Sequence, residues 1–282
     1  MDPGDFSEIG YEVGRGVALV RLNRPDRRNA WGGRMSVEYR WALHHAGADR
    51  GVHVVVVTGE GPDFCVGAHR GTLEDIDSRG GAYERERLEL PPVPEGLPPG
   101  LRHNHTLPLA LPVPVIAAVN GACAGAGFVL ATYADIRFGA DDARIATSFA
   151  HLGLPAEYGI GWVLPRMVGT ANAAQLLYSG GRLEAAEAFR LGWLQRVLPA
   201  AELLEASLDY AEGLARHSSP QSLRTMKRQI FVDAWGDLEE AYRRSVDDMN
   251  AAMGHADFRE GVTALRERRA TDFLASHGRD AP

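Results

Sequence analysis

The sequence predicts an α/β fold, because strands alternate with helices in its first half and helical patterns dominate from about residue 155 onward. Two buried strands are the main evidence. The β-branched run 52–58 ends at Gly59, and the apolar run 115–119 is followed by a turn of small residues and an expected helix over 126–133. No internal repeat is present.

The other elements are expected to be short in the first half and long in the second. Further strands are expected at 16–22, 135–138 and 143–146, with a helix at 34–48. In the C-terminal third, Ser218, Ser219 and Pro220 predict an N-cap followed by a proline in the first turn. Amphipathic helices are expected at 223–235, 237–253 and 258–273. They need a partner, which is either the core or another subunit.

Residues 80–114 form the one long segment without a clear pattern. The segment is rich in proline and glycine and carries a charged patch at 84–89. Such a stretch in a compact domain is either a functional loop or disordered, and the sequence leaves both readings open. A short helix near 101–109 is a further possibility. His103 and His105 lie here without a partner that the pattern can place.

Composition limits the classes of function. The chain has 282 residues, 45% of them hydrophobic and 24% charged, with a net charge of -7, so a basic nucleic-acid-binding face is not expected. Cys65 and Cys123 are too few for a disulfide framework or a metal cluster, and we expect buried free thiols. The N-terminal residues show no secretory signal, and Asn120 and several glycines interrupt the apolar run 113–132. We expect a cytoplasmic protein with no membrane, nucleic-acid or metal partner.

Two turns rich in small residues are the most informative feature. The first, FCVGAH at 64–69, follows a buried strand, and the second, VNGACAGAG at 119–127, leads into a helix N-terminus with unpaired N–H groups. Two N–H groups converging on one point would form an oxyanion hole, in which each donor is worth about 10²–10³ in rate. Such turns can equally serve close packing, and neither GxxxxGK[ST] nor GxGxxG is present.

Five segments form one ordered pattern along the chain. They are LNRP…NA at 22–30, VVVVTGEGPDFCVGA at 54–68, PVIAAVNGACAGAGFVLATYADI at 114–136, LGLPAEYGIGWVLPRMVG at 152–169 and ALRERR at 264–269. In this order the pattern resembles the signatures of the crotonase (enoyl-CoA hydratase/isomerase) family. Several long motifs that match together are far more specific than any one of them.

The resemblance implies both a fold and a ligand. The fold would be a spiral of ββα units over residues 1–200, which bind acyl-CoA, with a helical region at 201–282 that packs in a homotrimer or a dimer of trimers. The backbone N–H groups of Ala68 and Ala126 would hold the enolate oxygen of a CoA thioester, without a permanently bound cofactor. Ala126 stands where the family usually has glycine, and it still supplies an N–H provided that its φ is not positive.

The sequence departs from the family at the acid–base groups. Hydratases of the family use two glutamates to activate water, and these would fall at Val129 and Phe149. Neither side chain can move a proton, so water addition by the usual pair is not expected.

Glu157 is the remaining candidate for acid–base chemistry. In several family isomerases and in aryl-CoA dehalogenases, a carboxylate at the matching position is the base or nucleophile. Desolvation beside an apolar acyl pocket would raise its pKa and suit proton transfer. Alternatively, Pro155 starts a helix and Glu157 only favours the helix dipole in its first turn.

Several other side chains have open roles. His69 stands where the family commonly has aspartate; it could shuttle a proton or contact a substrate carboxylate, or it could be an exposed loop residue. Cys65 has no base placed near it by any motif, and Asp135 matches a structural aspartate of the family. Arginines that could meet the phosphates of CoA, or could be solvated, are Arg24, Arg27, Arg28 and Arg268, the last across a subunit boundary.

Three functional hypotheses follow from these residues. In the first, Glu157 moves a proton and the enzyme shifts a double bond. In the second, the same site hydrates, hydrolyses, decarboxylates or cleaves a carbon–carbon bond, with a larger role for His69. The third is a non-catalytic acyl-CoA-binding protein, which the loss of both glutamates would favour.

Overall fold

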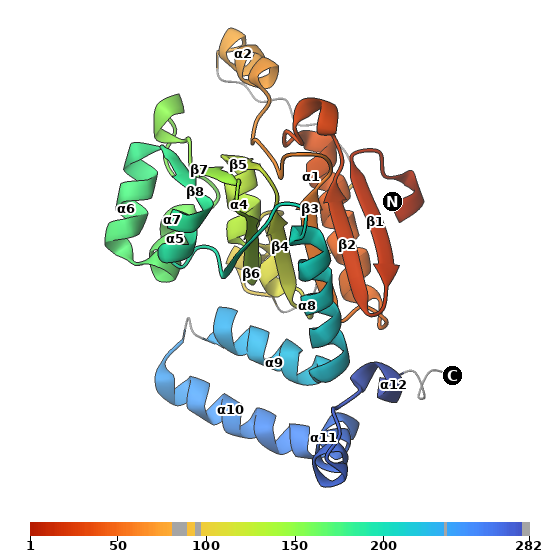
Figure 1. Ribbon diagram of the computed structural model, residues 1–282. Helices are drawn as coiled ribbons and strands as arrows, with labels where there is room; N and C mark the ends of the chain where they lie inside the picture. Colours follow the sequence, from red (N-terminus) through yellow and green to blue (C-terminus); the bar gives the residue numbers. More distant parts are fainter. Residues whose placement is uncertain (81–88, 94–96, 234–235, 278–282) are drawn as a thin grey trace.

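A six-stranded sheet forms the centre of the computed structural model, which describes residues 1–80, 89–93, 97–233 and 236–277. Its strand order is β1-β2-β3-β4-β6-β9, and all neighbouring pairs are parallel except β1 with β2 (Figure 1). The strands are β1 (Ile9–Gly14), β2 (Val17–Leu22), β3 (Val54–Gly59), β4 (Val115–Val119), β6 (Ile136–Ala140) and β9 (Arg196–Leu198). The predicted α/β class is confirmed.

Strand β1 was not anticipated from the sequence pattern, although a turn signal for it exists. Arg15 and Gly16 both have positive φ, and Gly14 pairs with Val17, so the two residues form a tight hairpin turn. Apolar residues alternate along β1 at Ile9, Tyr11 and Val13, whereas β2 after the turn is a nearly continuous apolar run. A hairpin therefore opens the chain and adds an antiparallel edge strand.

A second, three-stranded sheet lies beside the end of β4. It has the order β5-β7-β8, with β5 (Ala122–Ala124), β7 (Arg144–Ala146) and β8 (Arg182–Glu184). Because β5 begins three residues after β4 ends, the chain turns sharply between the sheets at Asn120 and Gly121. Gly121 has a φ of 53°, and a Cβ there would lie 1.9 Å from the carbonyl oxygen of Pro62. Only glycine fits this turn.

Helices cover the central sheet and flank the smaller one. In Figure 1, α1 (Gly33–Ala48) lies behind the sheet and α8 (Leu203–His217) in front of it. Helix α4 (Ala126–Thr132) follows β5, and Phe128 from α4 stacks on the buried Trp193 at 5.1 Å between ring centroids. Three further helices pack around the smaller sheet: α5 (Ile160–Val168), α6 (Thr170–Ser179) and α7 (Ala185–Arg190).

The segment 80–114 contains more regular structure than its composition suggested. Residues 81–88 and 94–96 lie outside the described part, so the functional-loop and disorder readings are not decided there. The remainder contains η3 (Pro99–Leu101) and α3 (Leu107–Ala110), in agreement with the short helix expected near 101–109. Leu101 and Leu107 are buried and anchor the segment to the core. Helix α2 (Arg70–Ser78) precedes it, and other short 3-10 turns are η1 (Pro3–Asp5), η2 (Pro25–Arg27) and η4 (Ala150–Leu152).

The helical tail begins with α9 (Pro220–Phe231), which is tied to the core by the single lysine of the sequence. The predicted cap is confirmed, because Ser219 accepts a hydrogen bond from the amide of Ser222. Lys227 is buried and donates to Asp135 at 2.7 Å and to the carbonyl oxygens of Pro108 and Val113. Burial lowers the pKa of Lys227, and Asp135 opposes this shift. Asp135 therefore has the structural role that was expected. Removing one partner of such a buried ion pair typically lowers the free energy of unfolding by about 3–5 kcal/mol.

The helices of the tail differ from the predicted boundaries in more than one place. The helix expected over 223–235 is α9, which begins earlier, at Pro220, and ends at Phe231. The helix expected over 237–253 is α10 (Leu238–Met253), with Asp237 as its N-cap. The helix expected over 258–273 is two helices, α11 (Ala256–Glu267) and α12 (Phe273–His277). Arg268 adopts the left-handed conformation and ends α11. This break was missed because no glycine or proline marks it.

Helix α8 belongs to the same packing unit as the sheet, whereas α10 and α11 lie below it in Figure 1. The division into residues 1–200 and 201–282 stays a prediction. Within the described residues, no helix is both long and apolar enough to cross a membrane.

Candidate functional site

The two small-residue turns lie side by side, as a catalytic site built from both would require. Cys65 and Cys123 form a parallel β-bridge. The Cys65 amide donates to the carbonyl of Ala122 at 3.0 Å, and the Ala124 amide donates to the carbonyl of Cys65 at 2.9 Å. These bonds extend the β5 edge of the smaller sheet into the turn after β3.

Glycine brings the two backbones into contact next to Ala68 and Ala126. Gly67 has a φ of 83°, and a Cβ on it would lie 2.8 Å from the carbonyl oxygen of Ala124 and 3.2 Å from the nitrogen of Ala126. Gly125, the N-cap of α4, has a φ of 51°. Both conformations are strained for other residues. Ala126 is absent from the residues with positive φ, which meets the condition for alanine at that position.

The amides of Ala68 and Ala126 have no hydrogen-bond acceptor in the described part of the chain. Ala126 is the first residue of α4, where an N–H has no partner within the helix. Ala68 is exposed and Ala126 half-buried. Two unpaired donors therefore lie on adjoining loops.

Polar side chains that sequence reasoning did not single out hold these loops in register. The Asn120 amide group donates to the carbonyl oxygens of Gly59 and Gly61 and accepts from the amide of Gly59. Asp63 accepts from the amide of Ala122 at 3.0 Å. The ends of β3 and β4 are thus tied together before either loop begins. The signal was visible in the sequence, since both residues sit inside the quoted motifs.

The first signature segment is joined to the same network. Arg28 donates twice to Asp63, at 2.7 and 3.1 Å, and Asn29 donates to the carbonyl oxygen of Asp63. Burial raises the pKa of Asp63, but the hydrogen bonds from Arg28 and Ala122 outweigh this and the net shift is downward. The amide of Trp31 donates to the carbonyl of Gly67 at 2.8 Å and completes the link to the first turn.

The two positions at which the resemblance places the family's glutamates are buried. Val129 in α4 is fully buried, and Phe149 is 3% exposed. Neither offers a group that could bind or activate water. That the usual hydratase pair is missing stays a prediction of the sequence.

Glu157 lies in a constrained turn before α5. It is half-buried, and burial raises its pKa. No described residue donates a hydrogen bond to its carboxylate or forms an ion pair with it. Helix α5 begins at Ile160 rather than at Pro155, and Gly159 is its N-cap. Glu157 is therefore outside the helix, which removes the reading in which it serves only the first helical turn.

The turn is held by α4, the helix that carries Ala126. The hydroxyl of Tyr133, at the C-cap of α4, donates to the carbonyl of Tyr158 at 2.5 Å. Tyr158 has a φ of 49°, an uncommon value for a bulky side chain, so the surroundings must hold it there. Glu157 is thereby fixed relative to the second small-residue turn.

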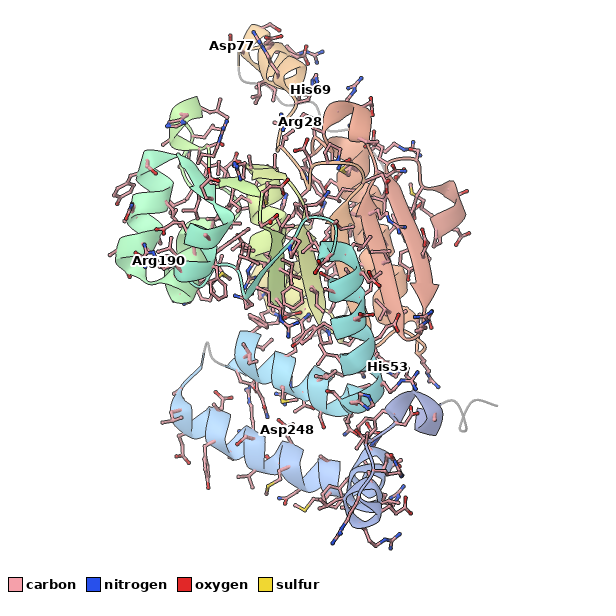
Figure 2. The ribbon with its side chains drawn as sticks, viewed as in Figure 1. Arg28, His53, His69, Asp77, Arg190 and Asp248 are labelled. Carbon is pink, nitrogen blue, oxygen red and sulfur yellow. The ribbon has the colours of Figure 1, made fainter. Side chains whose placement is uncertain are left out.

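His69 has a structural role in addition to any chemical one. It is the N-cap of α2, and its Nδ1 accepts a hydrogen bond from the amide of Gly71 at 3.2 Å. The side chain is exposed and lies at the same end of the molecule as Arg28 (Figure 2). Only Nε2 would be open to a substrate, and a catalytic role stays a prediction.

The arginines expected at CoA differ in how strongly they are already paired. Arg24 forms an ion pair with Glu8 at 3.3 Å, and Arg28 is held by Asp63. Within the described part of the chain, the one ion pair of Arg27 is a 3.9 Å contact with its neighbour Asp26. Arg268 is the C-cap of α11, and α11 lies well away from β5 and α4 in Figure 1, so the structure does not bring this arginine to the chain's own site.

The thiols are not available for chemistry. Cys65 and Cys123 are free and fully buried, as expected. Burial raises the pKa of Cys65 to about 12 and that of Cys123 well above its usual value. Neither thiol is a nucleophile at neutral pH.

Comparison with known proteins identifies the family. The description "Enoyl-CoA hydratase/isomerase" matches residues 12–276. The chain is 33% identical to a "probable enoyl-CoA hydratase" of Rhodobacter capsulatus, covering 95% of this chain and 98% of the relative. It is 34% identical to 1,2-epoxyphenylacetyl-CoA isomerase of Escherichia coli, covering 93% and 96%. The crystal structure of an enoyl-CoA hydratase from Polaromonas sp. JS666 is similar, with a TM-score of 0.81, 28% identity and coverage of 94% and 98%.

The chain therefore belongs to the enoyl-CoA hydratase/isomerase family, and it is an enzyme of that family with the crotonase fold. The sequence-based assignment is confirmed. A purely non-catalytic binding protein is set aside.

Proposed function

We propose that this enzyme shifts a double bond in an acyl-CoA thioester, with Glu157 as the acid–base group and the amides of Ala68 and Ala126 as the oxyanion hole. The observations that support the proposal are the half-buried carboxylate of Glu157 and the amides of Ala68 and Ala126, none of which has a hydrogen-bond partner among the described residues. The resemblance places the usual glutamates at Val129 and Phe149, which are apolar and buried.

The proposed reaction needs only these groups. The Glu157 carboxylate removes a proton from the α- or γ-carbon of the acyl group, and the electron pair of that C–H bond moves onto the thioester oxygen. The two amides donate hydrogen bonds to this negative oxygen. Protonated Glu157 then returns the proton to the other carbon, so the double bond moves and no atom is gained or lost. Its raised pKa favours both transfers near neutral pH.

Ordinary hydration is the second candidate, because a relative is described as a hydratase. It would need a group that activates water, and Val129 and Phe149 supply none. Hydrolysis, decarboxylation and carbon–carbon cleavage would each have to use Glu157 or His69 instead. Lyase chemistry is thus less well supported than isomerisation.

A substrate panel tests the reaction type. The purified enzyme is incubated with 3-enoyl-CoA, 2-enoyl-CoA, malonyl-CoA and aryl-CoA esters, and the products are separated by chromatography with mass detection. We expect 3-enoyl-CoA to give 2-enoyl-CoA of unchanged mass. A product heavier by one water, or free CoA as the main product, would replace isomerisation by hydration or hydrolysis.

The CoA end of the substrate would meet cations of the first signature segment. Arg27 is the best placed for a phosphate, because it is exposed and only weakly paired. Arg24 and Arg28 already form ion pairs with carboxylates, and a phosphate would compete with these for the guanidinium groups. Arg268 would contribute from a neighbouring subunit. The substrate supplies the only coenzyme in this proposal, and a cytoplasmic location stays a prediction of the sequence.

We propose that the helical tail forms a trimer, or a dimer of trimers. Apolar side chains of α11 repeat at helical spacing and are exposed, with Phe258 at 47%, Val262 at 49% and Leu265 at 80%. On α10, Leu238, Tyr242, Met249 and Met253 repeat similarly and are also exposed. A cavity of about 310 Å³ beside α11 is lined by Phe258, Val262 and Leu265. A second copy of the chain would cover this surface.

The oligomer can be measured directly. Light scattering after size exclusion should give three or six times the chain mass of 30.6 kDa. The L265D variant should dissociate into single chains. The V13S variant, which changes an exposed apolar residue on β1, should keep the mass of the wild-type oligomer. A wild-type mass equal to one chain would contradict the proposal.

A further inference from the structure

A buried histidine near the proposed site has no role in the mechanism above. His105 is 9% exposed, and its Nε2 is enclosed without a hydrogen-bond partner in the described part of the chain. A buried polar nitrogen without a partner is costly, so such a group in a folded protein calls for a physical reason. A ligand atom that bonds to Nε2 would provide one.

His105 contacts residues that adjoin both parts of the proposed site. On one side its ring stacks on Tyr158, with centroids 3.9 Å apart and planes 26° from parallel, and Tyr158 directly follows Glu157. Its ring also neighbours that of Trp31, with centroids 5.9 Å apart, and the amide of Trp31 donates a hydrogen bond to the carbonyl of Gly67, next to Ala68. The imidazole therefore touches residues adjoining the base and residues adjoining the oxyanion hole.

The position of His105 is fixed by its neighbours in the chain. Asn104 accepts a hydrogen bond from the buried Arg40 at 2.6 Å and donates to Ser36 at 3.0 Å, both on α1. Leu101 and Leu107 are buried on either side. The ring is thus held by packing and by α1, and it needs no bond of its own to stay in place.

The imidazole is neutral at physiological pH. Burial, with a smaller effect of His103, lowers the pKa of His105 to about 4. A neutral ring carries one N–H donor and one acceptor nitrogen, and it would not attract an anion. Its ligand is therefore expected to be an uncharged oxygen group.

We propose that Nε2 of His105 hydrogen-bonds an uncharged oxygen on the acyl group, and that the enzyme selects acyl-CoA thioesters bearing a hydroxyl or carbonyl over plain hydrocarbon chains. This inference rests on the proposed function, since it places the acyl group between Glu157 and Gly67. His105 acts here as a specificity residue and not as a proton carrier. An acyl chain that carries a carboxylate should not bind more tightly because of His105.

Saturated esters test the inference, because they have no double bond to shift and report binding alone. Calorimetric titration of the wild-type enzyme would compare hexanoyl-CoA with hydroxyhexanoyl-CoA esters carrying the hydroxyl at carbon 3, 4, 5 or 6. We expect at least one hydroxyl position to tighten Kd by about tenfold, the effect of one well-placed hydrogen bond. The H105F variant should bind hexanoyl-CoA as tightly as wild type and reduce the hydroxyl preference to less than about twofold.

Two further variants separate bonding from packing. H105N keeps a hydrogen-bonding group and should retain part of the preference, and H103F changes an exposed histidine of the same segment and should leave it intact. If no hydroxyl position is preferred, or if H105F keeps the preference, the inference is wrong. If hexanoyl-CoA itself does not bind to the wild type, the proposed function fails instead.

Discussion

Replacing Glu157 with glutamine is expected to lower kcat for double-bond isomerisation by about 10²–10⁴-fold. Glutamine keeps the size of the side chain but cannot take or return a proton. The carboxylate has no described partner, so its loss breaks no ion pair and folding should be preserved. Turnover by E157Q is measured in the isomerase assay, and binding of a saturated acyl-CoA ester is measured by calorimetry.

A matched control and a pH profile complete this test. E205Q removes an exposed carboxylate on α8 and should keep wild-type turnover. Because burial raises the pKa of Glu157, the wild-type rate should fall with decreasing pH through a value above that of an ordinary glutamate, where the base becomes protonated. Full activity in E157Q would remove Glu157 from the mechanism. Loss of ester binding together with turnover would indicate a structural role.

Replacing Gly127 with alanine is expected to separate the two loops that carry Ala68 and Ala126. A Cβ at Gly127 would lie 2.1 Å from the carbonyl oxygen of Cys65 and 2.9 Å from its Cβ. That oxygen is a backbone atom bonded to the amide of Ala124, so it cannot move aside without breaking the bridge between the turns. Overpacking of this kind typically costs about 1–3 kcal/mol. Displacing one oxyanion donor should cost a further 10²–10³-fold in kcat, roughly the loss seen for such donors.

G127A is compared with G213A, which adds the same methyl group to the interior of α8. Among the described residues, no atom outside the adjoining backbone of that helix lies within 4 Å of the new methyl group. The control should keep wild-type kcat and melt slightly higher, because alanine favours a helix by up to about 1 kcal/mol over glycine. Thermal melting measures the stability of both variants, and steady-state kinetics measure their kcat. If G127A melts and turns over like the wild type, the loops are not held together in the way that the close contact implies.

Much of the fold was readable from local pattern. The β-branched run that became β3 and the apolar run that became β4 stand out because parallel strands are buried on both faces. The cap at Ser219 and the stop at Gly254 are side-chain and backbone preferences that act within one turn. The missed hairpin strand β1 and the missed break at Arg268 lie where a non-glycine residue takes a positive φ, which pattern reading does not anticipate.

The sequence alone determined the family and the pair of small-residue turns, and it predicted the absence of the usual glutamates, because these are statements about which residues stand in which motif. Only the tertiary structure decided which of those residues act on one another. Asp63 and Asn120 join strands that are distant in the sequence. Glu157 lies outside helix α5, so it does not serve as a residue of the first helical turn. His105, from the segment 80–114, stacks on Tyr158. Burial and the pKa of a side chain depend on such long-range neighbours, and no local spacing encodes them.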